Sequence, residues 1–516
     1  MLHTQLIRPL PELLARNTAE RGERRAFTDD RGTVTWSELE QRTARVAAHL
    51  RGSVGSRKTV AICMANRIEA VESYIAVPRA GNVAAFLNPS ASVPELAYML
   101  EDSGAEALIL DADQRERLRA ATDRVAGLRE VIVVDGPEHS QDAVGYEAVL
   151  DAAAGGRPGE ALELDDPAWM LYTSGTTGRP KGVLLTQRSC LWVVAACWAP
   201  IAGLSADDEV LSPLPLFHSY ALDLSVLAVL ATGARERLLP RFSSDRVLEL
   251  LRSEPITFFP GVPTMFHYLV ERLGGEPLGA RALRRCVSAG AILSGALTDA
   301  FERAAGVPLL DGYGITETST MVTMNWPTGG RPRGSCGLPI PGSAVRLVDP
   351  ATGVDVSTGE DGEVLVRGPH LMAGYHNRPG DTAQALRGGW YHTGDLGRAD
   401  ADGYLTITGR IKELIIRGGE NIYPAEVEHA ITEHPDVVDA AVVGKPDEAL
   451  GEIVAAFVVI RGGALDLDDV RSFLAGHVAA YKLPAELHVI EQIPRTGSGK
   501  IKRHELRERL PSDVGR

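Results

Sequence analysis

Hydrophobic and polar positions follow two different periods along the first third of the chain, and together they predict an α/β fold. Residues 11–21 and 36–50 place apolar side chains on one face of a helix, whereas residues 59–63, 107–110 and 131–134 are short apolar runs typical of buried strands. Helices that alternate with strands favour βαβ units and mostly parallel sheets. We therefore expect a large α/β domain that begins near the N-terminus.

The same alternation continues through the middle of the chain, where several apolar runs end in small or turn-forming residues. Strands are expected within residues 168–172, 256–263, 285–291 and 308–314, and each leads into a loop that contains Gly, Ser or Pro. In open α/β sheets, ligands bind at the carboxyl ends of the strands. These four loops are therefore expected to surround a binding site.

After about residue 324 the pattern changes, and two further units are expected. Glycine and proline become more frequent, and short strands within residues 344–348, 362–367 and 403–408 predict a smaller β-rich subdomain. From Lys412 onward the pattern predicts a compact α+β unit, with expected helices at 424–434 and 467–480 and strands near 439–443 and 455–459. The predicted domains are residues 1–410 and residues 411–516.

Composition and charge restrict the class of protein. The chain has 516 residues, of which 44% are hydrophobic and 23% charged, and a net charge of −15, which argues against nucleic-acid or anionic-membrane partners. The uncharged segment 189–206 is interrupted by Pro200 and Gly203, so it predicts a buried helix and a turn rather than a membrane span. Five cysteines without a C-x-x-C pair and the lack of a signal-peptide pattern predict a cytoplasmic location.

Lysine is rare in this chain, which draws attention to the lysines that occur in motifs. Only seven of the 53 basic residues are lysines, and Lys181, Lys412 and Lys500 all lie in Gly-containing segments. A lysine offers a compact point charge on a flexible stem, which the planar guanidinium of arginine does not. These three lysines are therefore candidates for a role that arginine cannot fill.

A loop rich in glycine and hydroxyl groups follows the expected strand at 168–172. It reads Thr173-Ser174-Gly175-Thr176-Thr177-Gly178-Arg179-Pro180-Lys181. Such a loop can wrap a phosphate, because glycine lets the backbone approach closely and several N–H groups are free. It is not a Walker A motif, because Pro180 stands where that motif requires its second glycine. An ordinary P-loop NTPase is therefore disfavoured.

Three further motifs carry candidate chemistry. The segment from Asp311 to Glu317 combines an aromatic ring that can cover a base, a hydroxyl group and a carboxylate suited to Mg²⁺. Asp395 follows a Thr-Gly turn and can accept hydrogen bonds from ribose hydroxyls, and Lys500 on a loop of small residues can stabilise developing negative charge. Taken singly, each motif also fits a simpler interpretation, respectively a turn before a helix, a local cap and a basic tail.

In this order the motifs resemble the adenylate-forming superfamily, which includes acyl- and aryl-CoA ligases, the adenylation domains of peptide synthetases and firefly-type luciferases. The resemblance covers nearly the whole chain, and residues 214–222 look like the same segment of 4-coumarate and fatty acyl-CoA ligases. It implies a reaction in two steps. A carboxylate attacks the α-phosphate of ATP to give an acyl-adenylate and pyrophosphate, and a thiol then displaces AMP.

The resemblance also implies roles for individual residues. Lys500 would bridge the carboxylate and the α-phosphate, which Thr316 would also contact, and Glu317 would bind Mg²⁺. Asp395 and Arg410 would bind the ribose hydroxyls. The residues that would hold the β- and γ-phosphates are Thr173, Ser174, Gly175, Thr176, Thr177, Gly178 and Lys181, and those around adenine are Gly290, Ala291, Asp311, Gly312 and Tyr313.

A hinge between the two steps is implied in the same way. Lys412 matches the family's hinge position, where the C-terminal domain would rotate so that one pocket serves both steps and water stays excluded. Rotation would withdraw Lys500 and bring Gly418 and Gly419 to line the tunnel for the pantetheine of CoA or of a carrier protein.

The acyl pocket is implied less directly. His218 and Tyr220 would border the acyl chain, with Gly261 and Val262 opposite. Amino-acid-activating domains have an aspartate where this chain has Tyr220, so an α-amino acid is not the expected substrate. Asp223 lies about one helical turn further on and is expected to be a capping or buried hydrogen-bonded acid rather than a substrate contact.

Several alternatives remain open at this point. The first interpretation is an acyl- or aryl-CoA ligase that uses ATP, Mg²⁺ and CoA, and the second is a stand-alone adenylating enzyme that loads an acyl-carrier protein. Luciferase-type oxidation and a nucleotide-binding sensor without activity are weaker candidates, because nothing indicates oxygen chemistry and Lys181, Glu317 and Lys500 are all present. The expected partner is a small carboxylic acid, and the expected state is a monomer or a homodimer.

Overall fold

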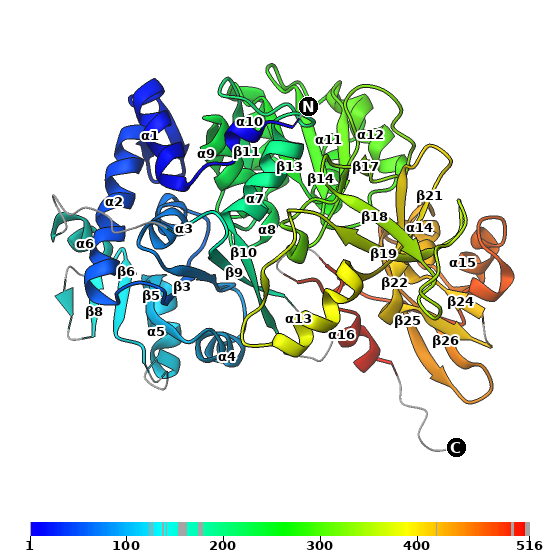
Figure 1. Cartoon of the computed structure of the whole chain (residues 1–516). Helices are drawn as coiled ribbons and strands as arrows, with labels where there is room; N and C mark the ends of the chain where they lie inside the picture. The colour runs from blue at the N-terminus through cyan, green and yellow to red at the C-terminus, as the bar shows by residue number, and fades with distance from the viewer. Residues whose placement is uncertain are drawn as a thin grey trace.

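Two nine-stranded sheets form the body of the molecule (Figure 1). The computed structural model describes residues 2–122, 125, 127–136, 139–140, 142–152, 162–173, 179–418, 420–496 and 500–510. In the first sheet, short antiparallel strands flank a parallel core. The core strands are β1 (Arg25–Thr28), β12 (Arg235–Leu238), β11 (Glu209–Ser212), β13 (Phe258–Gly261), β14 (Arg285–Ala289) and β15 (Leu309–Tyr313), and the flanking strands are β2 (Thr33–Thr35), β16 (Thr323–Met324) and β17 (Leu338–Pro339).

The second sheet is also mostly parallel. Its parallel strands are β3 (Thr59–Cys63), β4 (Val83–Phe86), β5 (Ala105–Asp111), β6 (Glu130–Val134), β8 (Ala143–Gly145) and β9 (Pro167–Thr173). The antiparallel strands are β7 (His139–Ser140), β10 (Lys181–Thr186) and β20 (Gly374–Tyr375). The expected strands at 59–63, 107–110, 131–134 and 168–172 all lie in this sheet.

Alternation of side chains across each strand produces the layers of the body. In β3, Val60 and Ile62 join the core between the two sheets, whereas Ala61 and Cys63 face the opposite cluster under α4 (Val93–Ser103) and α5 (Ala112–Thr122). The outer face of the first sheet is covered in the same way. The helices there are α10 (Ser244–Ser253), α11 (Pro263–Leu273) and α12 (Gly295–Ala305).

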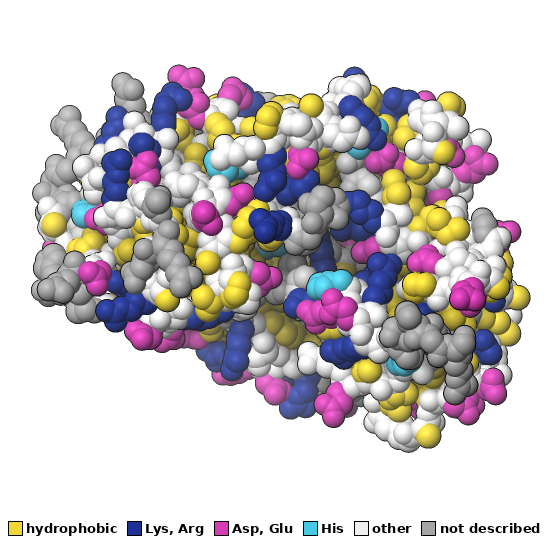
Figure 2. Space-filling model, turned by 90° about the horizontal axis from the view of Figure 1, so that it is seen from below, with side chains coloured by type: hydrophobic (Ala, Val, Ile, Leu, Met, Phe, Trp, Pro, Cys, Tyr) yellow, Lys and Arg dark blue, Asp and Glu magenta, His cyan; other side chains and the backbone are white. Residues whose placement is uncertain are grey.

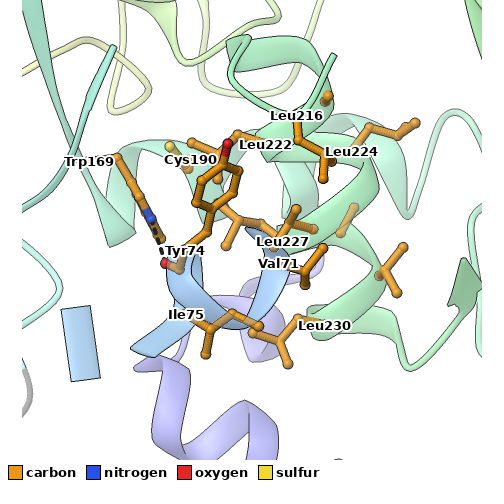
Figure 3. Packing of buried hydrophobic residues seen from close by; sticks show 14 of the residues in the cluster. Val71, Tyr74, Ile75, Trp169, Cys190, Leu216, Leu222, Leu224, Leu227 and Leu230 are labelled. Atoms are coloured by element: carbon orange, nitrogen blue, oxygen red, sulfur yellow. Dashed lines mark hydrogen bonds between the residues drawn. The ribbon is translucent and has the colours of Figure 1, made fainter. Parts of the chain in front are cut away.

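The helices between the sheets are buried on nearly every side. In α3 (Ile68–Arg79) every residue except Glu69 is buried. Figure 3 shows its Val71, Tyr74 and Ile75 packed among leucines of the π-helical η3 (Leu222–Ala228) and of α9 (Val229–Thr232), while Trp169 Nε1 of β9 donates to the Tyr74 carbonyl at 3.0 Å. Most of its residues are apolar, and its buried Glu72 and Arg79 have charged partners, Arg42 and Glu40.

The uncharged segment 189–206 lies in this layer, in α7 (Gln187–Val193) and η2 (Val194–Trp198). It is a buried helix followed by a turn, as predicted. Among the described residues, no helix is both long and apolar enough to span a membrane. The remaining helices of the body are η1 (Thr4–Leu6), α1 (Leu10–Arg21), α2 (Trp36–Ser53), α6 (Tyr146–Ala152), α8 (Ser219–Ala221) and η4 (Thr316–Thr318).

A four-stranded antiparallel sheet follows the body, as the rise in glycine and proline predicts. It contains β18 (Ala344–Val348), β19 (Gly362–Arg367), β21 (Tyr391–Ala399) and β22 (Leu405–Arg410), with α13 (Pro379–Ala385) and η5 (Arg387–Gly389) inserted before β21. The turn η6 (Ile411–Glu413) then leads into the last unit (Figure 1). The predicted fold class, α/β with a β-rich subdomain and an α+β C-terminal unit, is confirmed.

The C-terminal unit packs helices against a five-stranded sheet. Its elements are β23 (Ile415–Arg417), β24 (Glu420–Ile422), α14 (Pro424–Thr432), β25 (Val437–Asp447), β26 (Gly451–Ile460), α15 (Leu467–Leu474), η7 (Ala480–Lys482), β27 (Glu486–Val489) and α16 (Arg503–Glu508). The helix predicted at 424–434 ends at Thr432, and the helix predicted at 467–480 ends at Leu474, two residues before Gly476. Glycine has a low helix propensity, so the helix does not continue through it.

Candidate active site

The carboxyl ends of parallel strands from both sheets point toward one region. Thr173 ends β9, Gly261 ends β13, Gly290 follows β14 and Tyr313 ends β15. Gly290 and Val262, which follows Gly261, line a small cavity of about 20 Å³, which Lys500 reaches from the C-terminal unit. Its lining residues are Leu214, Pro215, His218, Tyr220, Ala221, Val262, Gly290 and Lys500. Residues that are nearly 300 positions apart in the sequence therefore share one cavity.

Lys500 has a mixed electrostatic environment at this cavity. Burial lowers the pKa of Lys500 and the charge of Arg410 lowers it further, whereas the carboxylates of Asp395, Glu317 and Glu413 act in the opposite direction. Its backbone N–H donates to Thr496 Oγ1 at 3.1 Å. In Figure 2, Lys and Arg side chains surround a hollow near the middle of the face shown. The ammonium group thus reaches the apolar cavity while it is partly balanced by carboxylates.

Asp395 is buried and joins two other predicted residues, the buried Tyr313 and the exposed Arg410, in one cluster. Its Oδ1 pairs with Arg410 Nε at 2.7 Å, and its Oδ2 accepts a hydrogen bond from the Tyr313 hydroxyl at 2.7 Å. Asp395 and Arg410 lie directly opposite each other in the β21–β22 pair. The charge of Asp395 raises the pKa of Arg410, so the guanidinium stays charged. The structure therefore brings together residues from two different sheets.

The turn η4 carries Thr316 and Glu317 next to this cluster. Glu317 Oε1 accepts a hydrogen bond from the Tyr375 hydroxyl at 3.0 Å, and Thr316 Oγ1 lies 3.4 Å from Ser219 Oγ. The turn is reached through Gly314, where an added Cβ would lie 1.5 Å from the carbonyl oxygen of Thr320. Only glycine fits there, so the sharp course of the chain into η4 depends on it.

The phosphate-loop candidate lies partly outside the described residues, but both of its flanks are well defined. Ser174, Gly175, Thr176, Thr177 and Gly178 are not described. On either side, Thr173 pairs with Lys181 in the β9–β10 ladder. Tyr98 of α4 donates its hydroxyl to the Pro180 carbonyl at 3.1 Å, and the Tyr172 hydroxyl donates to Asp102 Oδ2 at 3.0 Å. The loop is thus anchored to α4 at both ends.

Lys181 forms an ion pair with a residue that lies outside its sequence motif. Its Nζ lies 2.7 Å from Asp381 Oδ2 of α13 and 5.3 Å from the centre of the Tyr375 ring. Tyr375 and Asp381 reach the site because β20 pairs with β10. No local pattern in the sequence indicates that pairing, so these two residues were missed.

The predicted adenine residues fall into buried and exposed groups. Asp311 and Gly312 are buried in β15, whereas Ala291 is exposed, and Gly290 turns the chain with a φ of +90°. Burial raises the pKa of Asp311 well above its ordinary range, and its Oδ1 has no hydrogen-bond partner among the described residues. An unpartnered buried polar atom is costly unless a ligand or water satisfies it.

The predicted acyl residues form a mostly apolar wall. The Tyr220 hydroxyl donates to the Val287 carbonyl at 3.1 Å and its ring stacks on Trp198, which fixes its orientation. Burial and the nearby charge of Lys500 lower the pKa of His218 to about 3, so its ring is neutral at neutral pH. Val262 and Gly290 line the same cavity, whereas Gly261 at the end of β13 faces the ring of Phe266 instead. Trp198 was not singled out from the sequence.

Asp223 lies elsewhere and agrees with expectation only in part. It is buried in η3, and both carboxyl oxygens lack a hydrogen-bond partner among the described residues. Its burial agrees with the expectation, whereas no partner for its carboxyl group lies among the described residues. Burial raises the pKa of Asp223 well above its ordinary range, which keeps the side chain neutral.

The predicted hinge and CoA residues lie at the start of the C-terminal unit. Lys412 is in η6, and burial together with the charges of Lys181 and Arg410 lowers its pKa. Gly418 has a φ of +58° and donates its N–H to the Leu450 carbonyl at 2.7 Å. Gly419 lies outside the described residues. Positive charges from three separate segments therefore converge in a chain that is strongly acidic as a whole.

Comparison with known proteins agrees with this geometry. Residues 14–376 match the family described as AMP-binding enzyme, and residues 426–500 match its C-terminal domain. The chain is 36% identical over 484 residues to an indoleacetate–CoA ligase of Aromatoleum aromaticum, with 92% of this chain and 93% of that protein covered.

Two solved structures are similar over almost their whole length. One is an ATP-bound MatB of Rhodopseudomonas palustris, with a TM-score of 0.87, 31% identity, and 96% of this chain and 98% of that one covered. The other is an anthranilate CoA ligase in complex with anthranoyl-AMP, with a TM-score of 0.89, 27% identity and 98% of each chain covered. The chain belongs to the AMP-binding enzyme family, the adenylate-forming proteins that its motifs resemble.

Proposed function

We propose that this protein is an AMP-forming ligase that joins an apolar carboxylic acid to the thiol of CoA through an acyl-adenylate. The observation that carries the proposal is the position of Lys500, which lines an apolar cavity and is also close enough to Asp395, Glu317 and Arg410 to interact with their charges. The cavity as it stands has room for about one water molecule, so its walls would move apart to admit the acid. An acid there and a nucleotide on Asp395 would both be within reach of Lys500.

The residues present fit ATP. Lys181, Arg410, Lys412 and Lys500 supply positive charge for a triphosphate, and the like charges of Lys181 and Arg410 already lower the pKa of Lys412. Asp395 would hold the ribose hydroxyls, with Arg410 beside it. Adenine would lie near Gly290, Ala291, Asp311, Gly312 and Tyr313, and the β- and γ-phosphates on Thr173, Lys181 and the loop between them, which comprises Ser174, Gly175, Thr176, Thr177 and Gly178.

In the first step, the ammonium of Lys500 would neutralise the repulsion between the substrate carboxylate and the α-phosphate. Electrostatic stabilisation of this kind is strong in a site that excludes water. Thr316 would contact the α-phosphate. Glu317 would bind Mg²⁺, an ion that neutralises charge on the leaving pyrophosphate when it is bound.

In the second step, the C-terminal unit, residues 411–516, would rotate about Lys412 relative to residues 1–410. Lys500 would leave the cavity, and Gly418 and Gly419 would line the path of the thiol. The exchange lets one cavity serve two reactions without admitting water.

The wall of the cavity favours an acid without a second charge. Among the described lining residues the only ionisable side chains are Lys500, the neutral His218 and the buried Tyr220. An α-amino group would find no carboxylate there, which agrees with the replacement of aspartate by Tyr220. We therefore propose an aromatic or aliphatic monocarboxylic acid as the substrate.

A panel of carboxylic acids, including indoleacetate, anthranilate and a fatty acid, tests this proposal. Release of pyrophosphate with an apolar acid is expected, followed by acyl transfer when CoA is supplied. A carrier-protein thiol, the alternative acceptor, is offered in parallel, and gel filtration decides between monomer and homodimer. Preferential activation of alanine or phenylalanine would contradict the assigned pocket. A cytoplasmic location is proposed as well, to be tested by cell fractionation.

A further inference from the structure

The side chain of Asn66 crosses from one sheet to the loops of the other. Asn66 follows β3 of the second sheet and is buried. Its Nδ2 donates to the carbonyls of Leu214 at 2.7 Å and Leu239 at 3.0 Å, and its Oδ1 accepts from the N–H of Leu216 at 2.8 Å. Leu214 follows β11 and Leu239 follows β12, so one amide joins two loops of the first sheet to a third loop of the second.

The sequence after β11 explains why this amide is needed. Pro213 and Pro215 have no N–H, so the segment cannot continue as a paired strand. Leu214 and Leu216 are nevertheless buried, and in the described part of the chain the Leu214 carbonyl and the Leu216 N–H bond to Asn66 alone. Buried peptide groups require partners. The Asn66 amide, with one donor group and one acceptor, takes the place of a neighbouring peptide unit.

The segment that Asn66 holds is a wall of the cavity beside Lys500. Leu214 and Pro215 line that cavity, and His218 follows at the start of the next helix. The His218 N–H bonds back to the Pro215 carbonyl at 3.0 Å, so the course of residues 214–218 is continuous with the position of the histidine ring. A shift of Leu214 would therefore change the shape of the cavity in which the acid is proposed to bind.

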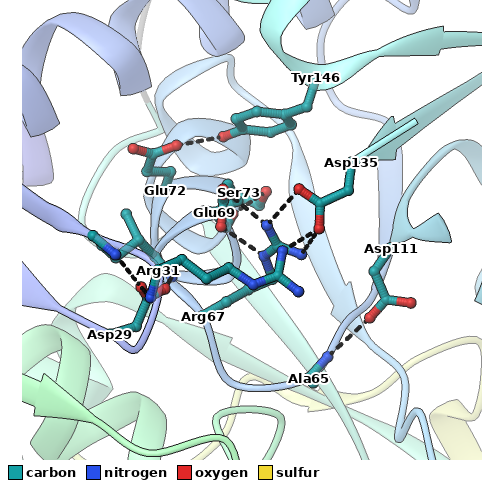
Figure 4. A network of polar contacts seen from close by, with 12 residues as sticks. Asp29, Arg31, Ala65, Arg67, Glu69, Glu72, Ser73, Asp111, Asp135 and Tyr146 are labelled. Atoms are coloured by element: carbon teal, nitrogen blue, oxygen red, sulfur yellow. Dashed lines mark hydrogen bonds and ion pairs between the residues drawn. The ribbon is translucent and has the colours of Figure 1, made fainter. Parts of the chain in front are cut away.

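The loop that carries Asn66 is itself held firmly. Arg67 pairs with Asp135 at 2.8 Å and Glu69 at 2.6 Å, and the N–H of Ile68 donates to Asp29 Oδ2 at 3.0 Å (Figure 4). Asp29, Arg67 and Asp135 border a cavity of about 450 Å³, which Asn66 also lines. The network fixes the backbone from which Asn66 reaches toward Leu214.

We propose that Asn66 is a positioning residue for the acyl-binding wall. It does not touch the cavity beside Lys500, but it sets the position of Leu214 and Pro215, which do. The inference rests on the proposed function, because the cavity must be the acyl pocket for the acid to sense the change. It assigns to a residue outside all of the motifs a part in the choice of substrate.

The test compares Asn66→Ala with Asn82→Ala. Asn82 is a matched control, because it is buried, accepts from the Lys58 N–H at 2.9 Å and donates to the Gly55 carbonyl at 3.0 Å, all at the amino end of β4. Both variants are expected to lower the melting temperature. Only Asn66→Ala is expected to raise the KM for the acid, by tenfold or more, and to change the ratio of kcat/KM between a small and a bulky acid, with the KM for ATP within twofold of wild type.

Each outcome decides the matter. An unchanged KM and selectivity for the acid in folded Asn66→Ala, or equal changes in Asn82→Ala, would overturn the role of Asn66 while the proposed function stands. Absence of acid-dependent pyrophosphate release by the wild-type protein would overturn both. If Asn66→Ala does not fold, Asn66→Leu is used instead, because it keeps nearly the size of the side chain and removes the donor and the acceptor without adding a charge. It is expected to show the same selective change in KM for the acid.

Discussion

Replacement of Lys500 by alanine should separate the two half-reactions. Lys500 lines the proposed acyl cavity, and its charge interacts with those of Asp395, Glu317 and Arg410. Removal of the side chain takes away the one cation that reaches both the cavity and this cluster from the C-terminal unit, within the residues described. We expect acid-dependent pyrophosphate release to fall strongly, whereas transfer from supplied acyl-AMP to CoA should stay near the wild-type rate.

The size of the effect follows from the surroundings of the lysine. Loss of one preorganised group that stabilises developing charge in a water-excluded site costs roughly 10²–10³ in rate, or about 2.7–4 kcal/mol. Burial already lowers the pKa of Lys500, so the charged form is poorly solvated by water and is strongly attracted to an anion. We therefore expect the upper part of that range.

The rate of the first half-reaction is measured as pyrophosphate released in samples quenched at successive times. The rate of the second is measured by chromatography of the acyl-CoA formed from synthetic acyl-AMP. Lys502→Ala is the matched control, because Lys502 is on the same segment and pairs with Glu505 at 2.7 Å. It should leave both half-reactions unchanged. Equal loss of both half-reactions in Lys500→Ala, at an unchanged melting temperature, would refute the assigned role.

Three other changes have defined outcomes. Tyr313→Phe removes a donor to the buried carboxylate of Asp395, so urea unfolding should show a loss of about 1.5–3 kcal/mol and the KM for ATP should rise; an unchanged stability would contradict the bond. The pKa of His218 is lowered to about 3, so below pH 6.5 protons bind the unfolded chain in preference to the folded protein. Between pH 6.5 and 5, the free energy of unfolding should therefore fall by up to about 2 kcal/mol more in wild type than in His218→Gln. An equal fall in both proteins would argue against this. In Gly314→Ala the new methyl group would overlap a backbone oxygen, so circular-dichroism melts should show a loss of at least about 3 kcal/mol of stability, and most of the pyrophosphate release should be lost. The control Gly306→Ala, at a φ of +71° with open space around it, should lose about 1 kcal/mol of stability.

The sequence predicts most of the architecture because the periodicity is strong. The period-2 and period-3.6 patterns locate the central strands of both sheets, and the predicted fold class and superfamily are confirmed. What local patterns miss are long-range pairings. Short strands such as β20 are too brief to show a period, and β20 brings Tyr375 and Asp381 to Lys181.

The candidate site was predictable where each residue stands in its own motif. The cluster of Tyr313, Asp395 and Arg410 forms as the motifs suggest, although their roles toward ATP remain proposals. Asn66 forms a hydrogen bond with Leu214, 148 positions away, and Trp198 stacks on Tyr220, 22 positions away. No spacing in the sequence indicates such contacts. Asp223 is a further example: the sequence predicts that it is buried, but not that its carboxyl group has no hydrogen-bond partner among the described residues.

One measurement tests the central claim most directly, namely that an acyl-adenylate forms before any thiol is involved. Exchange of labelled pyrophosphate into ATP is followed in the presence of an apolar carboxylic acid, with Mg²⁺ and without CoA. The account predicts acid-dependent exchange that gives way to AMP and acyl-CoA once CoA is added. Absence of exchange with every acid of the panel, or formation of ADP in place of AMP, would contradict it.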